Sequence, residues 1–320
     1  MKEFPRLLEI VRQVSREREL SRKTETAYIN HIRRFQNFYA ERDLTELDAT
    51  GINDFLNHLK QAENLAVSTQ NQALSALSFL YRDVFGQEMA QDCLKIAKHT
   101  KPAGKAPVVF TATEARAVLS KMRGDTFLVA ALMYGSGLRL SEAVAVRVGD
   151  IDLGRREIIV REARSGRRER VTVLPAVIIP ALKRHLTNVR YLHEDDCLLG
   201  YGRVRLPKSI ENKCPQAGFD WRWQYVFPSH NLSAGTTTHR HHLAESTVQK
   251  AVGEAILKAN IIKPACCQTF RYSFAARLFE RNYDIRRIQT LLGHKNLKTT
   301  AVYMQFALSG KRNVRSPLDT

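Results

Sequence analysis

The stretch from Cys266 to Tyr303 constrains this chain most, because its apolar spacing predicts three short helices, each placing one reactive side chain. The first should begin at Arg271 and bury Phe270, Phe274, Leu278 and Phe279. The second is predicted from Ile285, Ile288, Leu291 and Leu292, and Gly293-His294 follows it directly. The third should carry Tyr303, with an apolar face made by Leu297, Ala301 and Val302. We therefore expect a guanidinium, an imidazole and a phenol within reach of one another.

These three groups suit attack on a phosphodiester. A phenol with a pKa of about 10 is a poor nucleophile at neutral pH. Attack becomes feasible when cations neutralise the non-bridging oxygens and stabilise the charge of the transition state. Arginine fits this role because its planar fork binds phosphate in bidentate fashion and stays charged. Any one of these residues alone would ordinarily be a packing or solvated residue, but the combined spacing favours a site.

A second arginine, Arg139, follows Gly137 at a predicted junction between a loop and a helix. The segments GSGLRLSE and LGH…Y together resemble the tyrosine recombinases, and the resemblance runs over nearly the whole chain. It implies that Arg139 and Arg271 hold the scissile phosphate, that His294 assists, and that Tyr303 forms a 3′-phosphotyrosyl intermediate. Glu142 matches the family acid that supports the first arginine. The implied activity is DNA strand transfer in site-specific recombination, with no cofactor, neither metal nor nucleotide.

The charge balance also favours a nucleic-acid partner. The 320 residues include 50 Lys+Arg against 32 Asp+Glu, which gives a net charge of +18, and neutralised phosphates release counterions. No apolar run approaches the ~20 residues of a membrane span, and the first residues lack a signal-peptide core. The five cysteines show no disulfide framework or metal spacing, so we expect a reduced, bacterial cytoplasmic setting.

The length predicts about two domains. Helical patterns capped by Ser21 and Asp48 predict a helical N-terminal core-binding domain over residues 1–98. A Pro/Gly/Lys stretch predicts a linker over 99–110, and a capping box at Thr111 opens a catalytic domain over 111–320. The expected fold is mostly α with a small antiparallel β element, in the two-domain tyrosine-recombinase architecture, with a mixed α/β catalytic domain. Three helix residues are candidate phosphate contacts or simply solvated: Lys23, Arg33 and Arg34.

Two positions depart from the family pattern. Strands at 156–163 and 170–174 are predicted to flank a basic turn, where the family carries a lysine that protonates the leaving 5′ oxygen; here there is none. Arg164 is the best match to this lysine, Ser165 occupies its position in a gapless alignment read back from the second strand, and Arg167 and Arg168 are nearby alternatives. Arginine is a poor general acid at neutral pH. The family motif His-x-x-Arg is altered to Gln268-Thr-Phe-Arg271. Both changes predict weaker acid–base capacity, and hence reduced turnover or a non-catalytic DNA-binding relic.

A segment of about residues 198–243 resembles the insertion of the integron integrases, through LPKSIENKCP, DWRWQYVFPS and RHHL. The resemblance implies recombination of folded single-stranded cassette sites, and of duplex attachment sites, to integrate or excise gene cassettes. Trp223, or alternatively Trp221, matches a tryptophan that packs on an extrahelical base, and His241 and His242 match residues that hold a second one. A Xer-like or phage-type recombinase acting on duplex sites is the alternative.

The histidines near residue 240, with Cys214 or His230, fit no standard zinc spacing, so no metal is expected. The chain after Tyr303 is expected to pack into a neighbouring subunit of a DNA-bound homotetramer, again by resemblance; disorder of its last residues is the alternative.

Overall fold

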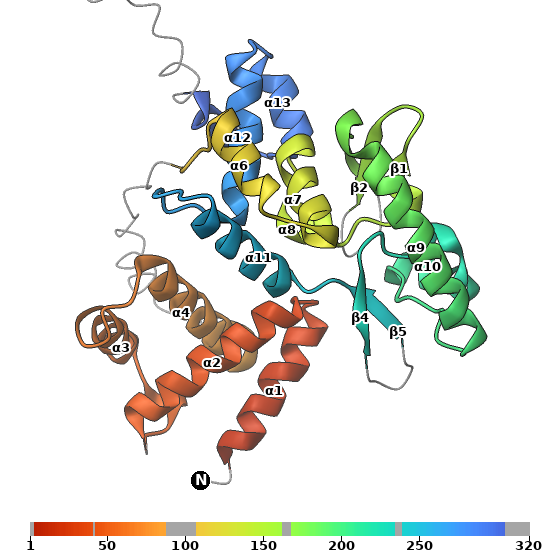
Figure 1. The fold of residues 1–320 in the computed structure, drawn as a ribbon. Helices are drawn as coiled ribbons and strands as arrows, with labels where there is room; N and C mark the ends of the chain where they lie inside the picture. Colours follow the sequence, from red (N-terminus) through yellow and green to blue (C-terminus); the bar gives the residue numbers. More distant parts are fainter. Residues whose placement is uncertain (1–2, 41, 88–106, 162–167, 234–238, 305–320) are drawn as a thin grey trace, which may run out of the picture. The chain divides into compact units, whose positions relative to one another are not determined.

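The computed structural model describes residues 3–40, 42–87, 107–161, 168–233 and 239–304. The chain separates into two compact units, residues 1–105 and 106–320 (Figure 1). Helices predominate in both, and the described strands form one three-stranded and one two-stranded antiparallel sheet. The predicted fold class is therefore confirmed. None of the helices in the described ranges is both long enough and apolar enough to cross a membrane.

The described residues of the first unit contain the α-helices α1 (Glu3–Glu17), α2 (Arg22–Tyr39), α3 (Ala49–Gln61) and α4 (Val67–Phe79). A 3₁₀ turn spans Leu44–Glu46, and a π-helical turn, Leu80–Val84, continues α4. The predicted caps are present, since Ser21 accepts from the backbone N–H of Thr24 and Asp48 accepts from that of Gly51. Phe35, Phe55 and Leu77 are fully buried at the centre of this unit. The helical periodicity and the caps in the sequence therefore predicted the helical character of this unit.

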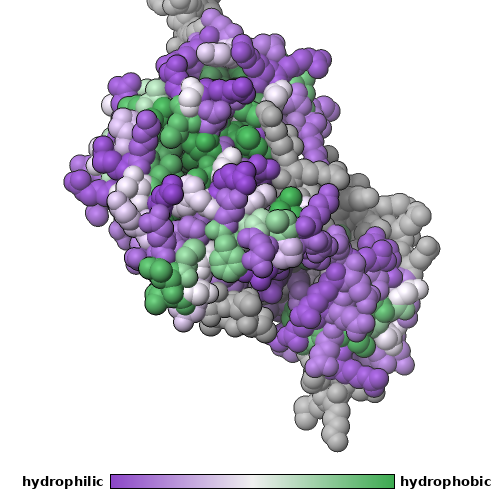
Figure 2. All heavy atoms as spheres, turned by 90° about the vertical axis from the view of Figure 1, so that its right-hand side faces the viewer, coloured by the Kyte–Doolittle hydropathy of each residue, from purple (hydrophilic) through white to green (hydrophobic). Residues whose placement is uncertain are grey.

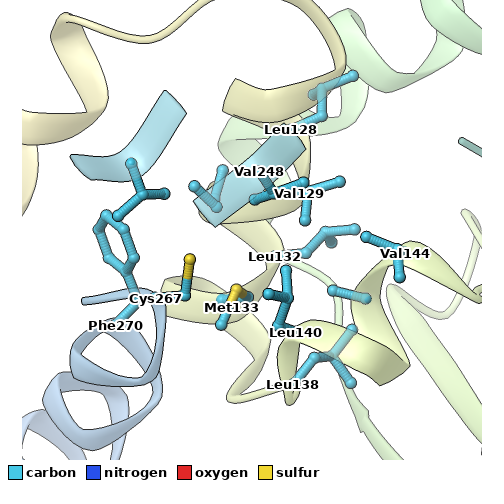
Figure 3. Close-up of a cluster of buried hydrophobic side chains, with 14 of the residues drawn as sticks. Leu128, Val129, Leu132, Met133, Leu138, Leu140, Val144, Val248, Cys267 and Phe270 are labelled. Carbon is cyan, nitrogen blue, oxygen red and sulfur yellow. The ribbon is translucent and has the colours of Figure 1, made fainter. Parts of the chain in front are cut away.

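The second unit is organised around α7 (Gly124–Ser136), which is apolar on nearly every side. It packs against α12 (Cys267–Glu280) and α11 (Glu245–Lys258), and also contacts α6 (Ala112–Ser120) and α9 (Ile179–Leu198). Figure 3 shows Leu132 and Met133 of α7 among Val248 of α11 and Phe270 of α12. The capping box predicted at Thr111 is present at the start of α6. This packing fixes the ends of α7 and α12, where the candidate site lies.

A three-stranded antiparallel sheet, in the order β1-β2-β3, lies beside this helical core. Its strands are β1 (Ile151–Asp152), β2 (Glu157–Arg161) and β3 (Arg168–Val173). The predicted hairpin is β2–β3, with Ile158 opposite Thr172, whereas β1 was not predicted. The Thr172 hydroxyl donates to the carbonyl oxygen of Ser136, which joins β3 to the end of α7. Along the chain, α8 (Leu140–Val144) and a 3₁₀ turn at Val148–Asp150 connect α7 to β1, and a 3₁₀ turn at Ala176–Ile178 connects β3 to α9.

The predicted insertion contains short elements: α10 (Lys208–Glu211), 3₁₀ turns at Pro215–Phe219 and Trp221–Trp223, and the two-stranded sheet of β4 (Pro228–Ser233) and β5 (His239–His242). Arg147 fastens it to the rest of the unit, because its guanidinium donates to the carbonyl oxygens of Trp223 and Arg205. A bidentate pair of Arg240 with Asp196 joins β5 to α9. The face of the molecule in Figure 2 is mainly hydrophilic, with hydrophobic side chains gathered in separate patches.

The last described elements are α13 (Ile285–Leu292) and α14 (Leu297–Ala301). The prediction for α13 is confirmed, and Gly293 ends it in the left-handed conformation with φ +65°. Two expectations were wrong. Arg271 lies in the second turn of α12 rather than at its start. The predicted apolar face of α14 is also wrong: Ala301 and Val302 are exposed, Thr300 and Tyr303 are buried, and Tyr303 follows the helix.

Candidate active site

One carboxylate, that of Glu142, is the common acceptor for three arginines. Arg139 donates to it both through its backbone N–H, at 2.8 Å, and through its guanidinium. Arg170 of β3 binds it in bidentate fashion at 2.6 and 3.1 Å, and Arg271 of α12 approaches at 3.4 Å. Burial alone would raise the pKa of Glu142, but the hydrogen bonds and charge of Arg170, and then those of Arg139, lower it to about 2. Glu142 is therefore an anion at neutral pH, and the cluster keeps an excess of two positive charges.

The turn between α7 and α8 brings Arg139 to this carboxylate. Gly137 ends α7 with φ +67°, and a Cβ there would lie 2.4 Å from the ring of Phe274, so only glycine fits. Arg139 then caps α8 with extended backbone, and Glu142 follows in the first turn. The side chain of Arg139 is 40% exposed, compared with 2% for Arg271. Arg139 is thus the arginine of the cluster that presents most surface to a ligand.

Arg271 is among the largest fully buried side chains of the protein. Its guanidinium donates to the carbonyl oxygen of Gly137 at 2.8 Å and to that of Leu292, the last residue of α13, at 2.6 Å. Burial and the neighbouring charge of Arg139 lower the pKa of Arg271 to about 10, so the group stays charged at neutral pH. These contacts join α12 to the ends of α7 and α13.

His294 follows α13 immediately, and its Nδ1 lies 2.9 Å from the hydroxyl of Thr300. Burial, and after it the charges of Arg271 and Arg139, lower the pKa of His294 to about 4. The imidazole is therefore neutral at pH 7. A neutral ring can donate a hydrogen bond to a phosphate oxygen from one nitrogen, but it is a weak base.

Tyr303 lies against this group, with its ring centroid 6.2 Å from that of His294 and 5.3 Å from that of Tyr272. The residue is 6% exposed and packs with Phe274 and Leu292. Burial, and then Tyr272, raise the pKa of Tyr303 to about 12, against the opposing effect of Arg271 and Arg139. The phenol is thus protonated at neutral pH, and a substrate must activate it in place.

Comparisons with known proteins identify the family. The family model described as "Phage integrase family" matches residues 109–308, which is more than half of the chain, and the model described as "Phage integrase, N-terminal SAM-like domain" matches residues 7–91. The chain belongs to the phage integrase family of tyrosine recombinases.

Relatives extend over the whole length. An "Integrase/recombinase" of Escherichia coli is 36% identical over 98% of this chain and 93% of its own length. A "Tyrosine recombinase XerD" of Lacticaseibacillus casei is 26% identical over 90% of this chain and 89% of that protein. Among solved structures, a Tn1549 transposon integrase in complex with transposon right end DNA gives a TM-score of 0.64 at 15% identity, covering 93% of this chain and 94% of that one. At that identity the match shows the fold alone.

Of the positions where this chain departs from the family pattern, Gln268 lies in the first turn of α12, one turn before Arg271, and is partly buried. No hydrogen bond joins its side-chain amide to another residue of the described ranges. Arg164, Ser165 and Arg167 lie outside the described residues; Arg168 opens β3. The structure therefore brings together Arg139, Glu142, Arg271, His294 and Tyr303, whereas Arg164, the best match to the family's hairpin lysine, lies outside the described residues.

The two tryptophans of the insertion each have arginine neighbours. The guanidinium carbons of Arg147 and Arg161 lie 5.4 and 5.5 Å from the ring of Trp223, and that of Arg190 lies 5.8 Å from the ring of Trp221. Both rings are partly exposed. Trp223 thus takes part in attaching the insertion to β2, whereas Trp221 lies against α9.

The two histidines predicted to hold a base are neighbours on β5. The ring centroids of His241 and His242 are 4.0 Å apart, and both rings contact Tyr225. Burial, and then the charge of His242, lower the pKa of His241. Both side chains are partly exposed.

The candidate phosphate contacts of the first unit all lie on α2. Lys23 and Arg33 are exposed, and Arg34 forms an ion pair with Glu63 of the segment after α3. This pair gives Arg34 a structural role.

The sequence reasoning missed Arg170. Its side chain is 3% exposed and lies inside the arginine cluster. A signal was present, because a strand alternates its faces, so that Arg170, Thr172 and Leu174 point the same way and all three are buried. Hydropathy alone would not show this face, since the apolar Val173 is 45% exposed.

Proposed function

We propose that this protein is a site-specific DNA recombinase whose Tyr303 cleaves and rejoins strands. The observation that carries the proposal is the convergence of three arginines, Arg139 and Arg271 among them, on the carboxylate of Glu142, beside the neighbouring rings of His294 and Tyr303. Arg139 and Arg271 supply fixed positive charge for a phosphodiester. The net charge of +18 and the family membership support DNA as the partner, as do neighbours of the same fold that were solved with DNA bound.

In the proposed reaction, the Tyr303 oxygen attacks the scissile phosphorus. A P–O bond forms to the phenol, the bond to the 5′ oxygen breaks, and that oxygen takes a proton to leave as a hydroxyl. The phenol proton passes to water in the same step, because the neutral imidazole of His294 beside it is a weak base, and water supplies the proton that the 5′ oxygen takes. A 5′ hydroxyl of another strand then attacks the phosphotyrosine and releases Tyr303. One phosphodiester-like bond replaces another at each step, so the exchange needs no nucleotide energy source.

The two departures from the family pattern lead us to propose a slow enzyme. Gln268 can donate a hydrogen bond to phosphate but cannot carry a proton. Arg164, the best candidate in the hairpin, is a poor acid at neutral pH. General acid–base assistance typically contributes about 10²–10⁴-fold, so its loss slows the reaction without removing the phosphate site. A relic that binds DNA without cleaving it is the second candidate, and the same two residues favour it.

We further propose the integron type, acting on folded single-stranded cassette sites within a homotetramer. The insertion supports this, because it presents Trp223, Trp221, His241 and His242 with partly exposed rings, and stacking on an unpaired base contributes roughly 1–3 kcal/mol. The alternative, a Xer-like recombinase acting on duplex sites, is favoured by the XerD relatives. The proposed packing of the C-terminal tail into a neighbouring subunit concerns residues 305–320, outside the described ranges.

The test is covalent trapping on end-labelled DNA. The protein is mixed with a folded cassette-site strand bearing extrahelical bases, and separately with the fully paired duplex of the same sequence. The proposal predicts a denaturation-resistant protein–DNA adduct that forms faster on the folded strand. Preference for the duplex would support the Xer-like alternative, and binding to both without any adduct would support the relic.

A further inference from the structure

Arg170 of β3 is a buried arginine at the proposed phosphate site, and its side chain contacts two other elements, α8 and α13. It lies in β3 opposite Val160, close to the described end of the β2–β3 hairpin. Its Nη2 and Nη1 donate to the two oxygens of Glu142 at 2.6 and 3.1 Å. Its Nε donates to the carbonyl oxygen of Leu291 at 2.9 Å. One side chain thus ties the hairpin to α8 and to the C-terminal end of α13.

The contact with α13 bears directly on His294. The last carbonyls of a helix lack partners within the helix and carry partial negative charge. Here Arg170 takes that of Leu291 and Arg271 takes that of Leu292, the two residues immediately before Gly293. The fit is tight, since a Cβ on Gly293 would lie 2.9 Å from Nη1 of Arg170. The place where the chain leaves α13, and hence the position of His294, depends on both arginines.

The contact with Glu142 bears on the other two arginines. A bidentate pair fixes the plane of the carboxylate as well as its distance. Glu142 in that orientation accepts from both the backbone and the guanidinium of Arg139. If Arg170 were absent, the carboxylate of Glu142 would be free to rotate toward the remaining cations. Arg139 and Arg271 would then lose the fixed acceptor that holds both guanidinium groups in place.

Arg170 itself has little access to a ligand. Its side chain is 3% exposed, whereas that of Arg139 is 40% exposed. We propose that Arg170 is a positioning residue for strand cleavage, which holds Glu142 and the end of α13 so that the two arginines and His294 present one geometry to the scissile phosphate. The inference rests on the proposed function, because it assigns Arg170 a part in that same site.

The test compares Arg170→Gln and Arg170→Lys with wild type in single-turnover cleavage of DNA carrying sulfur at the bridging 5′ position, which leaves without a proton donor. Misplacement of catalytic groups by about 1 Å can cost about 10²-fold, so Arg170→Gln should slow cleavage by about 10–100-fold, and Arg170→Lys by less. DNA affinity should stay within about threefold, because the buried side chain makes none of the many phosphate contacts. Arg155→Gln is the matched control, since Arg155 lies in the β1–β2 turn, is 79% exposed and should change neither quantity.

A second readout separates positioning from simple loss of stability. Removing the charge of Arg170 should raise the NMR titration midpoint of His294 toward its ordinary value in Arg170→Gln, while Arg170→Lys keeps it low. A folded Arg170→Gln protein that cleaves at the wild-type rate would overturn the inference, as would a rate loss matched by an equal loss of DNA binding. If tryptophan fluorescence shows that Arg170→Gln does not fold, Arg170→Lys takes its place. Cleavage by Arg170→Lys at the wild-type rate, or a rate loss matched by an equal loss of DNA binding, would then overturn the inference. Failure of the wild type to cleave the sulfur substrate would instead count against the proposed function.

Discussion

Replacing Glu142 by glutamine should destabilise the second unit by about 3 kcal/mol at pH 7. The structure lowers the pKa of this carboxyl from 4.5 to about 2, and at about 1.4 kcal/mol per pH unit the difference corresponds to about 3 kcal/mol. The side chain is only 13% exposed, so solvent screening is small. Loss of one partner of a buried ion pair typically costs about 3–5 kcal/mol, in agreement with this value. The cause is that Arg139, Arg170 and Arg271 would remain together without an anion.

The sign of the pH dependence follows from the lowered pKa. The ionised form is favoured in the folded state, so the contribution is complete above about pH 4.5 and is lost as the pH falls toward 2. The gap between wild type and Glu142→Gln should therefore shrink to roughly half its size at pH 3. If the difference in free energy of unfolding between wild type and Glu142→Gln were smaller at pH 7 than at pH 3, the lowered pKa would be contradicted.

Urea unfolding followed by tryptophan fluorescence measures this gap. Both tryptophans, Trp221 and Trp223, lie in the second unit, so the signal reports the unit that contains Glu142. Glu194→Gln is the matched control, because it breaks an exposed pair with Arg190 that should contribute about 0.5 kcal/mol or less. A loss of less than about 1 kcal/mol in Glu142→Gln would refute the claim that one carboxylate holds the arginine cluster together.

Three further results are expected. Trp223→Ala should weaken binding to a DNA hairpin with an extrahelical base by roughly 1–3 kcal/mol in a gel-shift titration. Its binding to the same hairpin without that base should stay at the wild-type level. Equal losses on both hairpins would mean that Trp223 only packs against Arg147 and Arg161. Arg164→Lys should speed the cleavage of ordinary DNA and change that of the bridging-sulfur substrate little, whereas Gln268→His should speed the cleavage of both. If neither variant cleaves faster than wild type, these two positions are not the cause of slow turnover. His294 should titrate near pH 4 in an NMR pH series of the free protein. A midpoint near 6.5 would mean that neither burial nor the nearby arginines lower its pKa.

Much of the fold follows from local patterns in the sequence. The caps at Ser21 and Thr111, the helix α13 ending at Gly293, and the β2–β3 hairpin were all predicted, because each depends on residues within a few positions of one another. The face of α14 was not, since burial there is decided by packing against Tyr272 and His294 rather than by hydropathy.

The candidate site shows the same division. Motif spacing found Arg139, Arg271, His294 and Tyr303, and the structure brings them together around Glu142. The sequence analysis did not identify Arg170 as a site residue, because its partners Glu142 and Leu291 are 28 and 121 positions away in the chain. Strand periodicity could place the side chain inward, but only the tertiary fold supplies the anion that makes a buried arginine stable there.

The most direct test of the central claim is to identify the residue that becomes joined to DNA. A substrate with sulfur at the bridging 5′ position releases a thiolate that needs no proton donor, so the adduct should accumulate despite the changes at Arg164 and Gln268. Digestion and mass spectrometry should then find the nucleotide on the peptide that contains Tyr303, and Tyr303→Phe should give no adduct while binding DNA nearly as tightly as wild type. An adduct on another residue, or an undiminished yield in Tyr303→Phe, would contradict the account.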